Sequence, residues 1–438
     1  MTAEVAIMNK ECVALAADSA VTLSNEKIFT SSNKIFRVSR DLPMGLMIYN
    51  RADFMGVPWE TVIKLYRIHL ENNNQHFDKL FDCVDNFISF LTLEFKNTQD
   101  SYFQKESVNF LSFIRGDIWQ NEQMGKHFKG SALTHEELST VAKRVIAFHH
   151  TRWEESQKIS SLTDEDILNI EKKYSTFLEE QIKRIYTEVP LDADLILNLK
   201  KIAISIFVKD SIFSPLFTGL VISGFGDKEL YPSLKTIVVF GVVNDKLHYA
   251  IADTNSIDNA NVPASVSAFA QNEMVDTFMK GINPKYAHEV ESCVDHIFHD
   301  YPLALLDFIE KTLKDKLILT GIDDSVKTEI KSQLQKIGDI EYQKCMKGFS
   351  EYQFVNHIKN ILDVVAYLPK DEVALMAESL VNLTSFKLKI SMQAPSVSGP
   401  IDVAVISKKD GFVWIKRKHY FSKELNPQFG VDVCDTRK

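Results

Sequence analysis

The first residues of the chain are of types that could carry out nucleophilic catalysis. Thr2 follows Met1, and Asp18 and Lys34 come shortly after it. Removal of Met1 would leave a hydroxyl and a free amine on the same residue. A threonine hydroxyl needs a nearby base, and an α-amine, whose pKa is usually roughly 7.7 to 8.0, titrates close to neutral pH. A lysine beside the hydroxyl would favour loss of its proton, and a carboxylate would hold that lysine in place. The sequence therefore predicts Thr2, Lys34 and Asp18 as a catalytic set.

Strand-like runs are expected to position this set. Residues 3–8 and 12–17 are apolar runs separated by the polar residues 9–11, a pattern typical of a β-hairpin. Asp18 ends the second run, and Lys34 directly precedes a third run at residues 35–38. The sequence thus predicts a β-hairpin that starts at the N-terminus.

These motifs resemble the N-terminal-nucleophile hydrolases, specifically the proteasome β-subunits and their bacterial relatives. In that family the threonine opens the first strand, the acid ends the second in a pattern like A-A-D-S-x-x-T, and the lysine begins K-I-F-x-I. Here residues 16–22 read AADSAVT and residues 34–38 read KIFRV, in register with Thr2. Residues 399–412, GPIDVAVISKKDGF, are similar to the family's final hairpin, G-x-I-D-V-x-V-I-x-x-x-D-G-Y.

The resemblance implies an α+β fold, a four-layer αββα sandwich of two antiparallel sheets between helical layers, with large all-helical insertions. The expected division of the chain has five parts. They are the first half of the core (2–56), a helical insertion (57–213), core strands and a helix (214–283), an additional helical region (284–366), and a C-terminal core helix with a strand hairpin (367–438).

The resemblance also implies further site residues. The backbone N–H of Asn50, where the family usually has a glycine, would form the oxyanion hole, and the Thr22 backbone would bind substrate. The supporting residues would be Ser19, Ser265, Ser267, Ser396 and Ser398, and the pocket would be lined by Val21, Ser32, Ile48 and Ala52. Besides Asn50, two departures from the family are visible: residues 393–399 lack the aspartate of its D-x-x-S-G stretch, and residues 264–268 lack the glycines of its G-S-G turn.

Helical periodicity dominates the rest of the chain. Apolar residues recur every three to four positions over 77–95 and 167–185, which predicts amphipathic helices there. Helices are also expected at 265–281 and 371–385. The glycines within 217–226 match neither a P-loop nor a dinucleotide fingerprint, so close backbone packing or a turn is the favoured interpretation. His296 and Asp300 share a helical face but are too few to hold a metal.

Composition limits the classes of function. The 438 residues include 50 Lys and Arg against 59 Asp and Glu, a net charge of −9 that disfavours nucleic acid as a partner. The basic run at 416–419 is interpreted as a solvated strand end. Five scattered cysteines without C-x-x-C spacing indicate a reducing compartment. With no signal-like start and no apolar run of membrane-spanning length, we expect a cytoplasmic protein without membrane contact, metal or cofactor.

The activity implied is amide-bond hydrolysis by a threonine peptidase-like enzyme, through an acyl-enzyme formed on Thr2. Its substrate would be a peptide or a small amide, and a homo-oligomer is a further expectation. Two alternatives stay open. The missing aspartate and glycines favour a catalytically inactive proteasome-like scaffold or binding subunit, whereas the complete catalytic set argues against it. A small-amide hydrolase of amidase or γ-glutamyl type is the other alternative, since this fold hosts several such enzymes.

Overall fold

The structure is a computed structural model that describes residues 3–23, 27–29, 31–120, 134–210, 214, 216–315, 324–391, 397 and 399–419. The predicted site residues Thr2, Ser396 and Ser398 lie outside these ranges.

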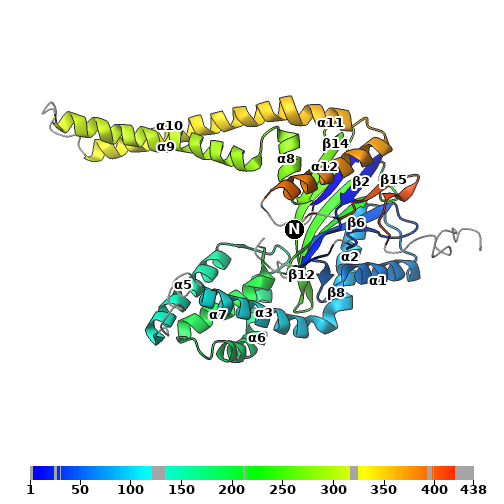
Figure 1. The fold of residues 1–438 in the computed structure, drawn as a ribbon, viewed down its shortest axis with the longest axis horizontal. Helices are drawn as coiled ribbons and strands as arrows, with labels where there is room; N and C mark the ends of the chain where they lie inside the picture. The colour runs from blue at the N-terminus through cyan, green and yellow to red at the C-terminus, as the bar shows by residue number, and fades with distance from the viewer. Residues whose placement is uncertain are drawn as a thin grey trace, which may run out of the picture.

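Two five-stranded antiparallel sheets form the centre of the molecule (Figure 1). The first has the strand order β14-β1-β2-β15-β16. Its strands are β1 (Ala3–Asn9), β2 (Cys12–Ala17), β14 (Ala264–Ala270), β15 (Asp402–Ser407) and β16 (Gly411–Lys416). The second has the order β13-β12-β11-β6-β5. Its strands are β5 (Ile35–Arg37), β6 (Met44–Asn50), β11 (Thr218–Gly224), β12 (Ser233–Val243) and β13 (Lys246–Ser256).

Three short strand pairs and many helices complete the described chain. The pairs are β3 (Val21–Leu23) with β4 (Lys27–Phe29), β7 (Asp53–Phe54) with β8 (Val57–Pro58), and β9 (Gln157–Lys158) with β10 (Lys209–Asp210). The helices are α1 (Trp59–Asn72), α2 (Leu80–Phe95), η1 (Lys96–Thr98), α3 (Gln99–Gln120), α5 (His135–Glu154), α6 (Asp164–Ile185), α7 (Ala193–Val208), α8 (Glu273–Lys280), α9 (Pro284–Asp315), α10 (Asp324–Gln353), η2 (Phe354–Ile358), α11 (Lys359–Val365) and α12 (Lys370–Ile390). The prediction of an α+β protein with two antiparallel sheets and many helices is confirmed.

The N-terminal hairpin is buried on both faces, which explains its nearly continuous apolar sequence. Alternate residues of β1 and β2, such as Val5 and Ala14, pack against α8 and α12. The intervening residues, such as Met8 and Leu15, join an apolar cluster that also contains Met47 and Val221 of the second sheet. The other face of the second sheet packs on α1 and α2. Period-two alternation in strands makes this division between two faces possible.

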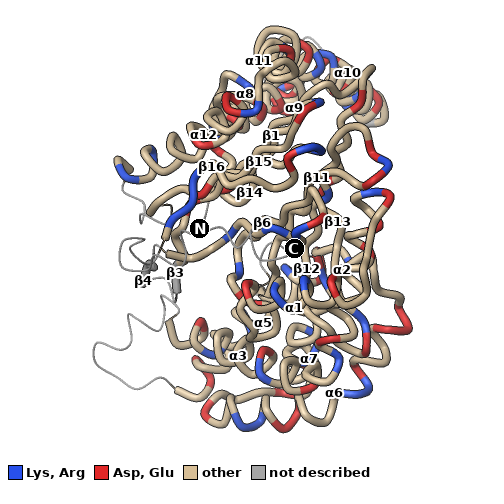
Figure 2. The backbone as a smooth tube through the Cα atoms, turned by 90° about the vertical axis from the view of Figure 1, so that its right-hand side faces the viewer, with Lys and Arg blue, Asp and Glu red and all other residues tan. Residues whose placement is uncertain are grey.

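The helices outside these clusters form two further bodies. We call α3, α5, α6 and α7 the helical lobe; it has its own apolar cluster, which also takes in Phe240 and Val243 of β12. The helices α9 and α10 pack together and project from the body as a long arm (Figure 1), which we call the helical arm. Figure 2 shows the arm and the lobe at opposite ends of the molecule, with the sheets between them. None of the helices within the described ranges is both long and apolar enough to span a membrane.

One predicted helix is wrong. Residues 265–281 were expected to be helical throughout, but residues 264–270 form strand β14 and only Glu273–Lys280 is the helix α8. The strand pairs with β1 from Ala270 to Ala264, so Ser265 and Ser267 lie opposite Met8 and Ala6 rather than in a turn before a helix. Serine and valine alternate there with period two, a strand pattern that the expected family motif obscured.

The glycines at 219, 224 and 226 serve close packing, as predicted. A Cβ on Gly219 would lie 1.9 Å from Cζ of Tyr49, and one on Gly224, at φ +140°, would lie 2.2 Å from the Pro43 carbonyl oxygen. A Cβ on Gly226 would come within 2.4 Å of Asp78 O. Each glycine therefore marks a close approach to a neighbouring segment.

Replacing Gly219 by alanine should destabilise the protein by about 1–3 kcal/mol, because the Tyr49 ring must move away from the new methyl group. Gly116→Ala is the matched control: Gly116 lies inside α3, and apart from its chain neighbours and the backbone of that helix no atom lies within 4 Å of its Cβ position. That control should be neutral or stabilise by about 0.5–1 kcal/mol. Urea unfolding of both variants tests this, and equal midpoints would contradict the packing argument.

His248 of β13 joins the helical lobe to the second sheet. Its Nδ1 donates to Phe207 O of α7 at 2.7 Å, and the side chain is buried. Burial lowers the pKa of His248 from 6.5 to about 4.

Between pH 6.5 and 4 the unfolded chain therefore binds a proton that the folded chain excludes, so the free energy of unfolding should fall as the pH is lowered through this range. The contribution of His248 is at most roughly 3 kcal/mol. Denaturation of wild type and His248→Gln across this range measures it: the variant should show the shallower pH dependence, and parallel curves would contradict the assignment.

Candidate active site

A buried lysine between two carboxylates is the centre of the candidate site. Lys34 Nζ lies 2.6 Å from Asp18 Oδ1 and 3.4 Å from Glu4 Oε1. The three side chains are exposed by only 3%, 1% and 0% for Lys34, Asp18 and Glu4. We call these three residues the Lys34 cluster. Burying charged groups costs free energy that their mutual attraction offsets only where further hydrogen bonds satisfy the charged atoms. The other contacts of the cluster therefore bear on its stability.

Backbone N–H groups donate hydrogen bonds to the carboxylate of Asp18. Its Oδ1 accepts from the N–H of Ala3 at 3.0 Å, and its Oδ2 accepts from the N–H of Ala20 at 3.1 Å. The pairing of Glu4 with Ala17 in the β1–β2 hairpin brings the start of β1 to the end of β2, where Asp18 N also donates to Ala3 O. The first described residue of the chain is thus held directly against the acid of the cluster.

Lys34 reaches the cluster from the second sheet. It precedes β5, and its carbonyl accepts from the N–H of Ile48 in β6 at 2.9 Å. The predicted partners Asp18 and Lys34 therefore come together across the interface between the two sheets. Glu4, the third member, was missed by the sequence analysis; its signal was a single acid inside an otherwise apolar strand.

Tyr49 borders the cluster and was also missed. Its ring stacks on Phe269 of β14 with a centroid distance of 5.8 Å. Burial, with a further contribution from the negative charge of Glu4, raises the pKa of Tyr49 to about 12. The phenol therefore stays protonated near neutral pH. No sequence motif marks this residue, because its ring contact with Phe269 joins strands that are far apart in the sequence.

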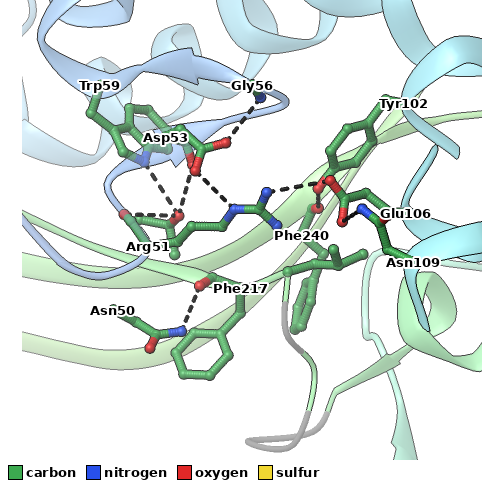
Figure 3. A network of polar contacts seen from close by, with 12 residues as sticks. Asn50, Arg51, Asp53, Gly56, Trp59, Tyr102, Glu106, Asn109, Phe217 and Phe240 are labelled. Atoms are coloured by element: carbon green, nitrogen blue, oxygen red, sulfur yellow. Dashed lines mark hydrogen bonds and ion pairs between the residues drawn. The ribbon is translucent and has the colours of Figure 1, made fainter. Parts of the chain in front are cut away.

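Asn50 ends β6 in a left-handed conformation, with φ +72°. Among residues with a side chain, asparagine is one of the few that adopts this region readily, and glycine adopts it at no steric cost. The Asn50 side chain is exposed and its Nδ2 donates to Phe217 O at 2.8 Å (Figure 3). The position expected to carry a glycine in the family therefore has a glycine-compatible backbone.

The segment after Asn50 is fixed by a polar network (Figure 3). Arg51 Nε lies 3.0 Å from Asp53 Oδ1, and its Nη2 lies 3.3 Å from Glu106 Oε1 of α3. Thr218 Oγ1 accepts from Trp59 Nε1 at 3.2 Å. Arg51 thus ties the segment after Asn50 to the helical lobe.

The remaining predicted site residues lie at several places. Ser19 is buried, and its Oγ donates to Pro400 O at 2.5 Å, while its carbonyl accepts from the N–H of Ser32. Val21 and Thr22 lie in β3. The Ile48 side chain belongs to the apolar cluster with α1 and α2, and the Ala52 carbonyl accepts from the N–H of Trp59.

The two serines of β14 face the same side as Glu4. Ser265 and Ser267 pair with Met8 and Ala6, which alternate with the β1 residues that pack on the helices. Their hydroxyls are 3.5 Å apart. The residue paired with Ala3 is Ala270, at φ +61°, so the turn into α8 begins beside the start of β1. This turn was not among the predicted site features.

The residues that the structure describes contain no group of three or more metal-ligating side chains. His296 Nδ1 pairs with Asp300 Oδ2 at 2.8 Å on an exposed face of α9, one turn apart. The described cysteines, Cys12, Cys83, Cys293 and Cys345, are free thiols.

Removing the lysine should reveal how far the Lys34 cluster depends on its one cation. In Lys34→Met, Asp18 and Glu4 would lose the ammonium that lies 2.6 Å and 3.4 Å from them, and the free energy of unfolding should fall by about 3–5 kcal/mol. Adding Glu4→Gln to Lys34→Met should recover part of this loss, because one of the two buried negative charges is then gone. Chemical denaturation measures both. A double variant as unstable as the additive sum of the two single variants would show that Glu4 and Lys34 do not interact.

Comparison with known proteins gives likenesses among solved structures. No protein-family model and no curated protein matches the sequence. Among solved structures, the chain is similar to Anbu, an ancestral β-subunit, from Yersinia bercovieri. The two are 10% identical, the match covers 98% of this chain and 93% of that chain, and the TM-score is 0.25. At so low a TM-score the likeness carries no argument about fold or activity.

Proposed function

We propose that this protein is an N-terminal threonine hydrolase that cleaves amide bonds. The observation that carries the proposal is the buried 2.6 Å contact between Lys34 and Asp18, with Asp18 also accepting from the N–H of Ala3. Thr2 is covalently joined to Ala3, so a nucleophile at Thr2 would be at most one residue from the cluster. The residues and their spacing match the motifs of proteasome β-subunits.

In the proposed mechanism Thr2 Oγ attacks the substrate carbonyl. The α-amine of Thr2, freed by removal of Met1, takes the hydroxyl proton directly or through a water molecule and returns it to the leaving amine. The ammonium of Lys34 lowers the cost of forming negative charge on Oγ, and Asp18 and Glu4 keep that ammonium in place. The N–H of Asn50 donates to the oxyanion. The resulting ester is then hydrolysed by water, which regenerates Thr2.

The proposed architecture is the four-layer αββα sandwich of N-terminal-nucleophile hydrolases. Three apolar clusters support it: one between the first sheet and α8, α11 and α12, one shared by the two sheets, and one between the second sheet and α1 and α2. The helical lobe and the helical arm would be insertions into this core. The five-part division of the chain given above stays part of the proposal.

The substrate is proposed to be a peptide, with a small amide as the alternative. Panels of fluorogenic peptides and of γ-glutamyl or other small amides, assayed side by side, distinguish the two. The pocket residues Val21, Ser32, Ile48 and Ala52 are neutral, which favours a neutral or apolar substrate side chain.

The decisive experiment is intact mass spectrometry before and after treatment with an epoxyketone or a β-lactone, reagents that capture an N-terminal threonine. We expect loss of Met1 and a single adduct that peptide mapping places on Thr2. Thr2→Ser should retain the adduct and Thr2→Ala should lose it. Asp18→Asn, if folded, should slow adduct formation at least tenfold, because Lys34 loses its charged partner.

Thr140→Ala is the matched control, since Thr140 is an exposed residue of α5 in the helical lobe. It should react like wild type. A folded protein that loses Met1 yet forms no adduct, or an adduct that persists in Thr2→Ala, would refute the proposed nucleophile and favour the inactive scaffold.

A further inference from the structure

A cavity at one edge of both sheets is unusually rich in arginine. It has a volume of about 560 Å³ and lies between β5, α1 and the end of β16. The strands β5 and β16 are edge strands of their respective sheets. Its lining includes four arginines, Arg37, Arg40, Arg67 and Arg417. We call it the arginine cavity.

The lining is strongly positive in a protein of net charge −9. Besides the four arginines, the lining contains one more cation, Lys64, and two acids, Glu60 and Glu71. These five positive and two negative groups leave a formal charge of +3. Glu60 already has partners, Lys64 Nζ at 3.1 Å and Asn33 Nδ2 at 3.2 Å. Among the described residues, none of the four arginines has a carboxylate within ion-pair distance.

Two of these arginines are held by neutral acceptors. Arg37 donates to the carbonyl oxygens of Ser39 and Arg40, and Arg67 donates through Nε and Nη2 to the carbonyl oxygen of Arg37. These bonds orient the guanidinium groups without cancelling their charge, and a guanidinium has five N–H donors, so others remain for a ligand. Burial and the nearby charges of Arg37 and Arg417 lower the pKa of Arg67, as expected for cations brought together.

Arg417 belongs to the basic run that was interpreted as a solvated strand end. The structure divides that run: Lys416 pairs with Glu378, Lys418 pairs with the buried Asp402, and Arg417 lies 4.8 Å from the ring centroid of Trp414. The lysines are therefore neutralised, whereas Arg417 lines the cavity. Figure 2 shows β16 at the edge of the first sheet, where this run begins.

We propose that the arginine cavity binds a small molecule carrying two or more phosphate groups. Planar guanidinium groups bind phosphate oxygens in pairs, and several of them around one cavity favour a ligand of several negative charges. A single carboxylate would leave most of the excess charge uncompensated. The volume lies within the range of ligand pockets for small molecules. Ile68 and Trp414, also in the lining, offer an apolar wall to a nucleoside or another organic group.

The site does not depend on the proposed hydrolase activity. It is close in sequence to the candidate active site, since Ile35 and Arg37 of the lining belong to β5, which directly follows Lys34. Binding can be measured without any catalytic readout, so failure of one proposal leaves the other testable.

Isothermal titration calorimetry of the full chain with tripolyphosphate and ATP, without divalent metal, tests the proposal. We expect one binding site per chain, with an affinity that falls as the salt concentration rises. Equal affinities would assign the site to the phosphates alone, and tighter binding of ATP would add the nucleoside to the ligand. Citrate carries less negative charge at neutral pH and has carboxylates in place of phosphates, so it should bind at least tenfold more weakly.

Variants locate the binding. Arg40→Gln and Arg417→Gln should each weaken tripolyphosphate binding about tenfold, the effect of losing a charge-assisted hydrogen bond. Arg40→Gln keeps the backbone carbonyl that accepts from Arg37, so it should fold normally. Arg184→Gln removes the same charge from an exposed position of α6 and should bind like wild type. No binding by wild type, citrate binding as tight as tripolyphosphate, or equal affinities in Arg40→Gln and Arg184→Gln would overturn the proposal.

Discussion

The ammonium of Lys34, enclosed between two sheets, is the constraint on which the site depends. A charge removed from water must be compensated nearby, and here the compensation comes from Glu4 in β1 and from Asp18, the residue after β2. This requirement fixes the β1–β2 hairpin against β5 and leaves little freedom in how the two sheets face each other. The apolar cluster between the sheets supplies most of the burial, but apolar contacts are not directional. The polar cluster is what specifies one alignment.

Local spacing predicted this part of the molecule well. The strands β1 and β2, the hairpin of β15 and β16, and the meeting of Asp18 with Lys34 all follow from motifs in which identity and separation act together. Short motifs of this kind indicate where strands begin, end and turn. They therefore predict which residues lie at the same end of a sheet. The helices over 80–95 and 164–185 followed equally directly from apolar periodicity.

Features that depend on contacts between distant segments were not predictable in this way. Ser265 and Ser267 were expected near a helix, because a family motif was given more weight than the alternation of β14. Glu4 has no motif of its own, and its meaning appears only when Lys34 is found 3.4 Å away. The arginine cavity collects residues from positions 33–71 and 414–417, and no pattern in the sequence joins these two stretches. Strand periodicity shows which face a residue occupies but not what lies across from it.

The helical arm restricts how copies of this chain can be arranged. Its longer helix has 32 residues, and at 1.5 Å of rise per residue it measures about 48 Å. The arm projects away from the sheets (Figure 1), so a molecule beside the sheets at that end would contact it. In a closed ring of identical subunits, each arm must either lie outside the circumference or extend along the rotation axis. In such a ring, an arm that extends along the axis would act as a spacer and set a minimum separation between whatever lies above and below the plane of the ring.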